Sequence, residues 1–339
     1  MRFPSSIAIS LLCVCPLAFG QTGTGSISGV VFSPAHNPTS GMAVEAKNVS
    51  TGTYYKTASS AKGEYTFSQL PVGTYEVSVL NLTFRPFVRK DLAVSAGGTQ
   101  HVDIQLVGDN TGSTLGELQA YLAVAARRPP PPAGPAPKTP DGKPDFTGVW
   151  MTPPRYAVPL IFSPPADLLP WAEAAVRERL MNQARDMPSS RCLPGSEALV
   201  SLLPSKYIQT ASVLVQLVED SPAAHQVFLD GRQHPSDLEP TWKGHSIGKW
   251  DGDTLVIDTV GFNDKSWLFL LVPHTEKLHV TQRLRRPDLG HLEIETTYDD
   301  PGTFKKPAIF KMVNVLAPDE EVDEVVCENN QYLEHISAK

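Results

Sequence analysis

Residues 25–107 alternate between apolar and polar positions in short runs that turn-forming residues separate. This alternation predicts strands that bury one face, and the spacing of the runs is typical of a small β-sandwich. The predicted strands are Ser26–Phe32, Ala43–Asn48, Tyr54–Ala58, Glu64–Ser68, Gly73–Leu80, Val88–Val94 and Gln100–Leu106. Tyr65, Phe67 and Tyr75 alternate with polar residues, so we expect these three rings in the core.

A linker is predicted over residues 108–140. Leu115–Arg128 is rich in alanine and leucine and predicts a short helix. Pro129–Pro140 predicts an extended, semi-rigid polyproline spacer that separates two domains.

Residues 141–335 form the second predicted domain, which begins with a Pro-rich stretch and one helix over Leu168–Arg185. Strands follow it at hairpin-length intervals. They are Tyr207–Thr210, Ser212–Glu219, Gln226–Leu229, His245–Trp250, Thr254–Thr259, Leu278–Arg285, Leu292–Tyr298, Ala308–Leu316 and Glu321–Cys327. This series predicts an up-and-down antiparallel β-barrel, lipocalin-like in architecture. The expected fold is therefore mainly β: a sandwich, a Pro-rich linker and a barrel with one short helix.

Composition and charge narrow the function classes. The chain has 339 residues and a net charge of −7, without any Lys/Arg-rich block, so we expect no nucleic-acid partner. Residues 1–20 predict a secretory signal peptide: Arg2 precedes an apolar run, and residues 18–20 form a cleavage site. No later apolar run reaches the length of a transmembrane helix. The predicted mature protein is exported, either to the periplasm or outside the cell.

Removal of the signal peptide leaves two cysteines, Cys192 and Cys327. In an exported protein such a pair favours a disulfide, and two buried free thiols are the alternative.

The N-terminal domain resembles the carboxypeptidase regulatory-like domain, which has a transthyretin-like, carbohydrate-binding-like fold. The similarity rests on Ile27–Val31, on Gly63–Phe67 and on Leu70, Gly73 and Tyr75. The resemblance implies an accessory module of a secreted protein, and some relatives bind sugars. Tyr54, Tyr55 and Phe84 are the aromatic residues that a sugar site here would use.

The C-terminal domain resembles a family of uncharacterised secreted proteins of Acidobacteria and related soil bacteria. The similarity rests on DGKPDFTGVW, RCLPG, FLDGR, PHTEKL, VCENN and the segment from Thr241 to Asp264. This resemblance implies no activity. Where the family often has Leu-Asp after the tryptophan, this chain has Leu268 followed by Phe269.

Thr241–Trp267 combines three tryptophans with a histidine and several aspartates, and the Asp-Gly turn at 251–252 predicts a hairpin within it. His245 lies between glycines, and Asp258 lies inside an apolar strand, where a carboxylate needs a partner or a function. His274 and Glu276 fall on one face of an extended segment. A histidine beside a carboxylate is the minimal unit for acid–base catalysis, so these four residues are the candidate catalytic groups.

The same region supplies candidate ligand contacts. Flat apolar walls for a sugar or another organic ligand could come from Trp242, Trp250, Phe262 and Trp267. Arg283 and Arg285 could pair with Asp258, line the barrel as structural ion pairs, or bind a ligand carboxylate.

The sequence predicts neither a cofactor nor a metal site. His225, His234, His245, His274 and Glu276 lack the spacing of a metal motif, and no Gly-rich phosphate loop or G-x-S-x-G motif is present. The leading hypothesis is an exported two-domain protein that binds a small organic or carbohydrate ligand at the barrel mouth. The alternatives are an acid–base enzyme (isomerase, lyase or hydrolase) in that mouth and a cell-surface interaction module.

Overall fold

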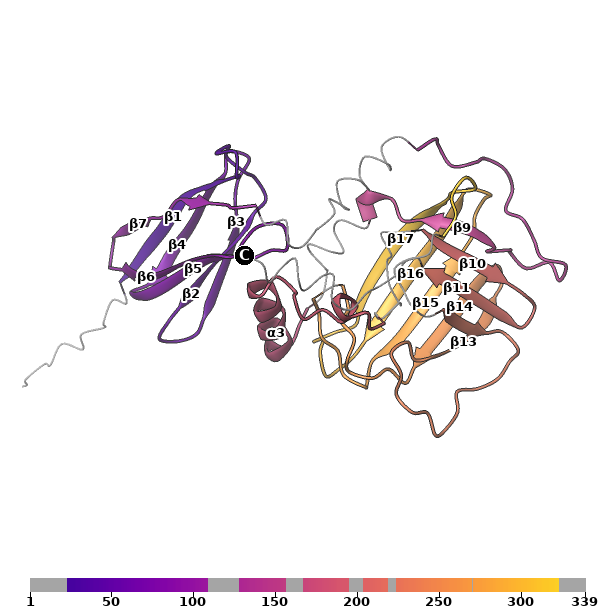
Figure 1. Cartoon of the computed structure of the whole chain (residues 1–339). Coiled ribbons are helices and arrows are strands. Elements are labelled where there is room, and N and C mark those ends of the chain that lie inside the picture. The colour runs from indigo at the N-terminus through magenta and orange to yellow at the C-terminus, as the bar shows by residue number, and fades with distance from the viewer. Residues whose placement is uncertain are drawn as a thin grey trace, which may run out of the picture. The chain divides into compact units, whose positions relative to one another are not determined.

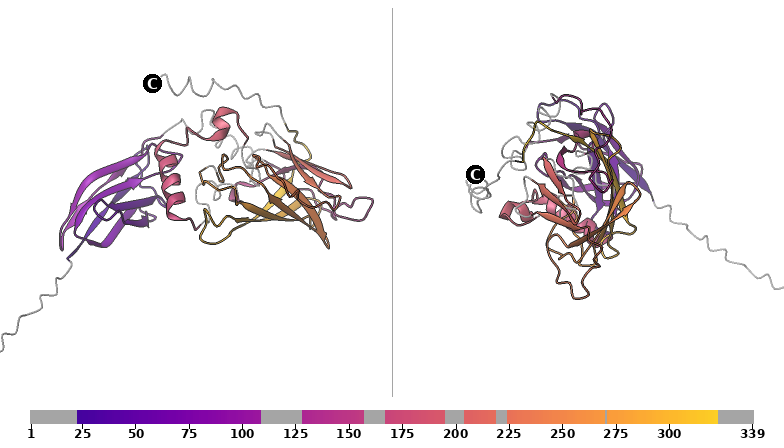
Figure 2. Two further views of the ribbon diagram at one scale, coloured as in Figure 1. Left: turned by 90° about the horizontal axis from the view of Figure 1, so that it is seen from below. Right: turned by 90° about the vertical axis from the view of Figure 1, so that its right-hand side faces the viewer.

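The computed structural model describes residues 23–108, 128–156, 167–194, 204–218, 224–269 and 271–322. It divides into two compact units. One unit holds the described residues before 80 together with residues 87–106, and the other holds residues 80–86 and those from 107 onward (Figures 1 and 2).

The first unit contains two sheets, as the alternating pattern predicts. The first sheet has the order β4–β1–β7, with β8 also paired to β1, and the second has the order β3–β2–β5–β6. The strands are β1 (Thr24–Phe32), β2 (Ala43–Asn48), β3 (Tyr54–Ala58), β4 (Glu64–Pro71), β5 (Gly73–Val79), β6 (Phe87–Val94), β7 (Thr99–His101) and β8 (Ile104–Gln105). Tyr65, Phe67 and Tyr75 are buried, which confirms that their rings belong to the core.

One predicted strand of the sandwich is interrupted. The sequence predicts Gln100–Leu106 as a single strand, whereas β7 and β8 pair with two separate stretches of β1. Between them, the backbone carbonyl of Val102 passes over Gly29 so closely that a Cβ on Gly29 would lie 1.9 Å from it. Asp103 accepts a hydrogen bond from the backbone N–H of Val30 in place of a regular strand partner (2.9 Å). The break therefore depends on the absence of a side chain at residue 29.

The second unit is a closed barrel, which confirms the predicted architecture. Its strand order is β10–β11–β12–β13–β14–β15–β16–β17–β9. The strands are β9 (Gly148–Met151), β10 (Ser205–Gln209), β11 (Val213–Val218), β12 (His225–Phe228), β13 (His245–Asp251), β14 (Thr254–Val260), β15 (His279–Arg285), β16 (His291–Asp299) and β17 (Ala308–Leu316). The predicted strand Glu321–Cys327 lies mostly outside the described residues.

Two features of the barrel differ from the predicted antiparallel meander. The short strand β9, which was not predicted, pairs with both β10 and β17 and closes the ring. Strands β12 and β13 pair in parallel. Strand direction reverses at each antiparallel pair, so a closed ring with an odd number of strands needs at least one parallel pair. The long connection of residues 229–244 carries the chain back to the start of β13.

Alternation divides the side chains of β13, β14 and β15 between the barrel interior and the outer face. Leu255, Ile257 and Thr259 are buried and point inward, whereas the side chains between them are partly exposed. Register places His245 opposite Val260, and Thr281 opposite Asp258. His245, Asp258, Thr281 and Arg283 therefore share the outer face.

The helix α3 (Pro170–Met181) is shorter than the predicted Leu168–Arg185. It begins with a proline, as expected, and ends at Met181 with Asn182 as its C-cap, because Gln183 and Ala184 take left-handed backbone angles. Ala172 belongs to the barrel core cluster and Val176 packs against it. A 3-10 helix, η2 (Pro188–Arg191), follows, and Cys192 ends it.

The described part of the Pro-rich segment is associated with the barrel. The backbone N–H of Leu289 donates to the carbonyl of Gly134 (2.9 Å), and Arg128 forms an ion pair with Glu320. A Cβ on Gly290 would lie 2.4 Å from the carbonyl of Pro132. Residues 128–140 thus belong to the second unit and lie against its barrel, whereas the sequence predicts an extended spacer that separates two domains. The predicted signal peptide and the helix of residues 115–128 lie outside the described residues, apart from Arg128.

Candidate functional site

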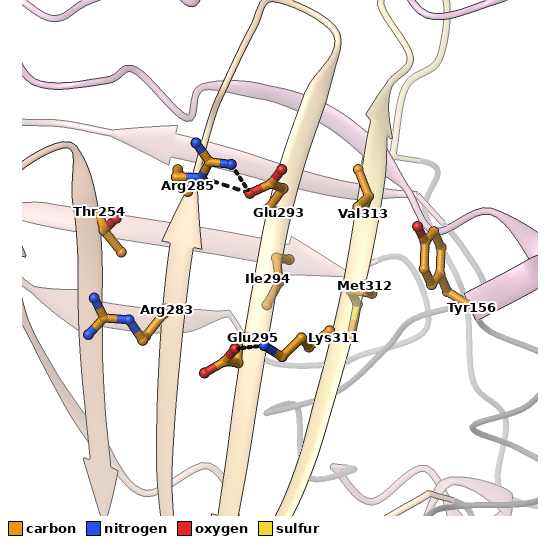
Figure 3. A pocket seen from close by; sticks show the side chains of 10 residues that line it. All are labelled: Tyr156, Thr254, Arg283, Arg285, Glu293, Ile294, Glu295, Lys311, Met312 and Val313. Atoms are coloured by element: carbon orange, nitrogen blue, oxygen red, sulfur yellow. Dashed lines mark hydrogen bonds and ion pairs between the residues drawn. The ribbon is translucent and has the colours of Figure 1, made fainter.

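A groove of about 330 Å³ lies on the outer face of β14–β17 (Figure 3). Such a volume is at the lower end of the range for small-molecule pockets. The lining residues are Tyr156, Thr254, Arg283, Arg285, Glu293, Ile294, Glu295, Lys311, Met312 and Val313. Both arginines that the sequence suggests as ligand contacts therefore line this groove.

The cations of the groove form ion pairs, two of them between neighbouring strands and the third, from Arg283 on β15, with Asp251 at the end of β13. Arg283 pairs with Asp251 at 2.8 Å, Arg285 with Glu293 at 2.7 Å, and Lys311 with Glu295 at 2.6 Å. Figure 3 shows the last two pairs side by side. Arg283 does not pair with Asp258, one of the partners suggested for it. These pairs are exposed, so each adds little to stability and remains available to a ligand.

The barrel interior offers much less space than the outer groove. Among the described residues, Thr152, Ser205, Gln216, Thr296 and Asn314 surround a polar hollow of about 10 Å³. This volume is about that of one water molecule. The described part of the barrel interior thus shows no space for a ligand at the expected barrel mouth, and the groove on the outer wall is a different place.

A hydrogen-bonded chain of three histidines and one aspartate lies at the other end of the same face. His245 on β13 contacts His234, which belongs to the 229–244 connection, through their Nδ1 atoms (2.8 Å). Nε2 of His234 lies 3.3 Å from Oδ2 of Asp258 on β14. His279 on β15 hydrogen-bonds through Nε2 to the other carboxylate oxygen of Asp258. We call these four residues the histidine cluster.

The carboxylate of Asp258 determines where the protons of the cluster lie. An ionised carboxylate only accepts hydrogen bonds, so His234 and His279 both carry a proton on Nε2. In a neutral His234, Nδ1 is then an acceptor and His245 donates its Nδ1–H to it. Nε2 of His245 is left with a lone pair. Asp258 thereby orients His234, and His234 orients His245.

The surroundings of His245 favour its neutral form. The ring of Phe228 stacks on it with centroids 5.4 Å apart, and the guanidinium of Arg232 lies 3.9 Å from the Phe228 ring centroid. Burial, assisted by the nearby His234 and Arg232, lowers the pKa of His245 below its usual value. Asp230 forms a bidentate ion pair with Arg232.

The other two predicted catalytic residues do not join this cluster or each other. His274 is buried, with Nε2 2.7 Å from the Ser266 hydroxyl and Nδ1 donating to the carbonyl of Thr275 (3.1 Å). Burial lowers the pKa of His274. Glu276 is exposed. The structure thus gives His274 a set of structural hydrogen bonds.

The predicted aromatic contacts are dispersed. Trp250 stacks on Phe146 near one end of β13 (5.7 Å between centroids), whereas Trp242 precedes the opposite end. Trp267 is covered by the guanidinium of Arg179 from α3 at 3.7 Å, and Phe262 is buried in the core. These four rings therefore do not form a single wall. Tyr156, which sequence reasoning missed, is the aromatic residue in the groove.

His234 and His279 were also missing from the predicted catalytic set. His234 lies in an irregular connection, where side-chain periodicity gives no information. His279 follows the predicted alternation of β15, and the shared outer face of β14 and β15 was the signal that could have identified it. Within the described residues, no group of three or more potential ligands is arranged for a metal ion.

Comparison with known proteins identifies the first unit. Residues 26–107 match the family model of the carboxypeptidase regulatory-like domain, so the sandwich is a domain of this kind. The comparison with curated proteins gave no match. Within the described residues, no helix is long and apolar enough to cross a membrane.

Several solved structures share similarity with parts of the chain. The Bacillus anthracis TIE protein is 20% identical over 25% of this chain, with a TM-score of 0.23, and the match spans 17% of that protein. A proposed carbohydrate-binding protein from Pseudomonas aeruginosa is 16% identical over 26% of this chain and 92% of its own, with a TM-score of 0.18. The major pilin SpaD of Corynebacterium diphtheriae is 11% identical over 89% of this chain and 70% of its own, with a TM-score of 0.24.

Proposed function

We propose that this chain is an exported binding protein whose barrel holds a small polar ligand in the outer groove of β14–β17. The observation that carries the proposal is the groove itself: about 330 Å³, with Arg283 and Arg285 in its lining. The sandwich serves as an accessory module. The predicted signal peptide and the resemblance of the barrel to secreted proteins of soil bacteria support the exported location.

The lining of the groove suggests the chemistry of the ligand. Three cations and two carboxylates line the groove, and Tyr156 lies at its β17 edge, where the guanidinium of Arg155 is 4.9 Å from the ring centroid (Figure 3). A sugar acid matches this set, because its carboxylate can displace Glu293 from the planar fork of Arg285 while its hydroxyls bond to Glu295 and Lys311. We therefore expect a small carbohydrate or hydroxy acid in preference to an apolar ligand.

The sandwich domain offers a weaker carbohydrate surface. Tyr65 donates its hydroxyl to the carbonyl of Val102, and Tyr75 donates to that of Pro71, so both rings are fixed in the core. The ammonium of Lys47 lies 5.5 Å from the Tyr54 ring centroid, on a face that a sugar would need.

The proposal is tested by ligand screening with the mature chain. Saturation-transfer NMR against neutral monosaccharides, uronic acids and disaccharides should detect binding, and calorimetry should then give Kd. We expect the double variant R283A/R285A to weaken binding at least tenfold, because it removes both guanidinium groups that would bind the carboxylate of the ligand. The control K249A changes an exposed lysine on β13 outside the groove and should bind as wild type does.

Two outcomes would contradict the proposal. One is a ligand whose Kd is the same for R283A/R285A and wild type, which would move the site away from the groove. The other is the absence of saturation transfer from the whole panel together with attachment of the protein to cell surfaces, which would favour the interaction module.

A further inference from the structure

The histidine cluster lies outside the groove and consists of different residues. Arg283 is four residues along β15 from His279, which corresponds to about 13 Å. The cluster residues come from four successive parts of the chain: the 229–244 connection, β13, β14 and β15. Three of the side chains are partly exposed, with 19% for His234, 41% for Asp258 and 45% for His279, and His245 is half-buried. Solvent therefore reaches the outer side of the cluster.

We propose that the cluster is a hydrolytic site in which Nε2 of His245 is the general base for water attack on small esters. The proposal extends beyond ligand binding and uses different residues from the groove. His234 and Asp258 are positioning residues, because they hold His245 in the tautomer whose Nε2 carries the lone pair. His279 holds the second oxygen of Asp258 and fixes the carboxylate.

The chain of hydrogen bonds accounts for the selection of this tautomer. Free histidine ordinarily has access to both neutral tautomers. Here the His245 Nδ1 atom is committed to His234 at 2.8 Å, so its proton stays on Nδ1. When Nε2 takes up a proton, the new positive charge lies one imidazole away from a carboxylate. This arrangement stabilises the charged form during reaction without placing the carboxylate next to the base.

The reaction balances with water as the only co-reactant. Nε2 of His245 removes a proton from water while the water oxygen bonds to the acyl carbon. The tetrahedral adduct then collapses, and the acyl C–O bond breaks with its electron pair on the leaving oxygen. That oxygen takes the proton from His245, which yields a carboxylic acid and an alcohol and restores the base. The Phe228 ring stacks on His245 and is itself covered by the guanidinium of Arg232, so it holds the plane of the base.

The test uses the mature full-length chain and p-nitrophenyl acetate. We expect hydrolysis above the buffer rate, and we expect H245Q to lose at least tenfold of the protein-dependent rate. D258N should lose part of it and change the pH profile, because its amide no longer restricts His234 to one tautomer. The matched control is H291Q: His291 also pairs with an aspartate, Asp288, on the outer surface, and should keep the wild-type rate.

A second measurement separates positioning from simple loss of structure. ¹⁵N spectra of the histidine side chains report which ring nitrogen carries the proton. We expect His245 to be the Nδ1–H tautomer in wild type. In H234A we expect His245 to populate the Nε2–H tautomer as well. Thermal unfolding of each variant will show whether the fold persists.

Three results would overturn the proposal. Hydrolysis equal to the buffer rate would show that the protein has no esterase activity. An unchanged rate in H245Q would show that His245 is not the general base. Stoichiometric retention of Zn²⁺ after dialysis, lost in both H234A and H279A, would make the cluster a metal site instead of a base. None of these results depends on the groove, so binding by Arg283 and Arg285 stands or fails separately.

Discussion

The buried carboxylate of Asp300 joins two loops at the end of the barrel where β16 ends. It is 0% exposed and accepts hydrogen bonds from the Thr275 backbone N–H (2.6 Å), the Thr275 hydroxyl (2.7 Å), the Gly302 N–H (2.9 Å) and the Thr303 hydroxyl (2.8 Å). Hydrogen bonds to a charged acceptor are the strong ones in proteins. This residue, which the sequence did not single out, fixes the segment that carries His274.

We expect D300N to lower the free energy of unfolding by about 2–4 kcal/mol, because the amide replaces one acceptor oxygen with a donor facing other donors. Urea denaturation of the full chain measures this change. The matched control is E276Q, an equally isosteric change at an exposed carboxylate, which should stay within about 0.5 kcal/mol of wild type. A loss for D300N as small as that of E276Q would contradict the structural role of Asp300.

His225 connects stability to pH. It points into the barrel, and its Nε2 lies 2.7 Å from the Ser246 hydroxyl. Burial lowers its pKa to about 4. Since the unfolded state takes up the proton near pH 6.5, this residue contributes stability at neutral pH that is lost as the pH falls from 6.5 toward 4.

The change H225Q should flatten this dependence. We expect wild type to lose roughly 2–3 kcal/mol more than H225Q between pH 7 and pH 4.5, and urea denaturation at both pH values measures the difference. H291Q serves as the reference because His291 is half-buried on the outer surface of the barrel and pairs with Asp288. Equal pH slopes in wild type and H225Q would show that His225 is not held neutral.

The residue scale also shows how far sequence reasoning about the site reaches. Asp258 was singled out because a carboxylate inside an apolar strand needs a partner, and His245 because it lies between glycines near carboxylates; both have hydrogen-bond partners in the structure. The link between them was not predictable. His234 lies in an irregular connection, and its position beside β13 depends on the parallel pairing of β12 and β13.

At the scale of elements, alternation predicts the sandwich strands and most of the barrel. It fails at β9, because Val149, Trp150 and Met151 are all buried and give no alternation. It cannot give strand partners either, so the parallel pair went unpredicted. The predicted helix is too long at its C-terminal end because the left-handed angles at Gln183 and Ala184 carry no glycine or asparagine signal.

Besides Ala172 and Val176, which pack on the core, Arg179 attaches the helix α3 to the barrel. Its guanidinium lies 3.7 Å from the Trp267 ring centroid, and it donates to the carbonyl of Leu271 at 2.6 Å. Burial lowers the pKa of Arg179 to about 10, so the side chain stays charged at neutral pH. A cation over a tryptophan face and a charged hydrogen bond are each worth about 1–2 kcal/mol.

We expect R179A to lower the free energy of unfolding by about 2 kcal/mol and to alter tryptophan fluorescence, since Trp267 loses its cover. R179K should recover only part of the loss, because lysine keeps the charge but not the planar stack. Equal stability of R179A and wild type, with unchanged fluorescence, would show that α3 does not depend on this contact.

At the scale of the whole molecule, the sequence correctly separates a sandwich from a barrel. For the segment between them, composition does not predict which surface the chain packs against. Pro129–Pro140 has the composition of an extended, semi-rigid spacer, and it lies against the barrel at Leu289 and Gly290. Proline prevents a helix or an inner strand here but does not prevent packing in an extended conformation.

The predicted disulfide is the remaining whole-chain constraint. Cys192 ends η2 with a left-handed backbone angle, and Cys327 lies outside the described residues, so their pairing stays a prediction. A bridge between residues 192 and 327 would enclose most of the barrel strands. In the chain-entropy model such a loop stabilises the folded state by roughly 4–5 kcal/mol.

Oxidised mature protein should therefore show no thiol that reacts with Ellman's reagent in denaturant, and its peptide map should contain a linked pair that separates on reduction. We expect the variant C192S/C327S to unfold at a lower urea concentration than oxidised wild type and to match reduced wild type. Two reactive thiols in oxidised protein would favour the alternative of buried free cysteines. A double variant as stable as the oxidised protein would show that the bridge, if formed, does not constrain the unfolded chain.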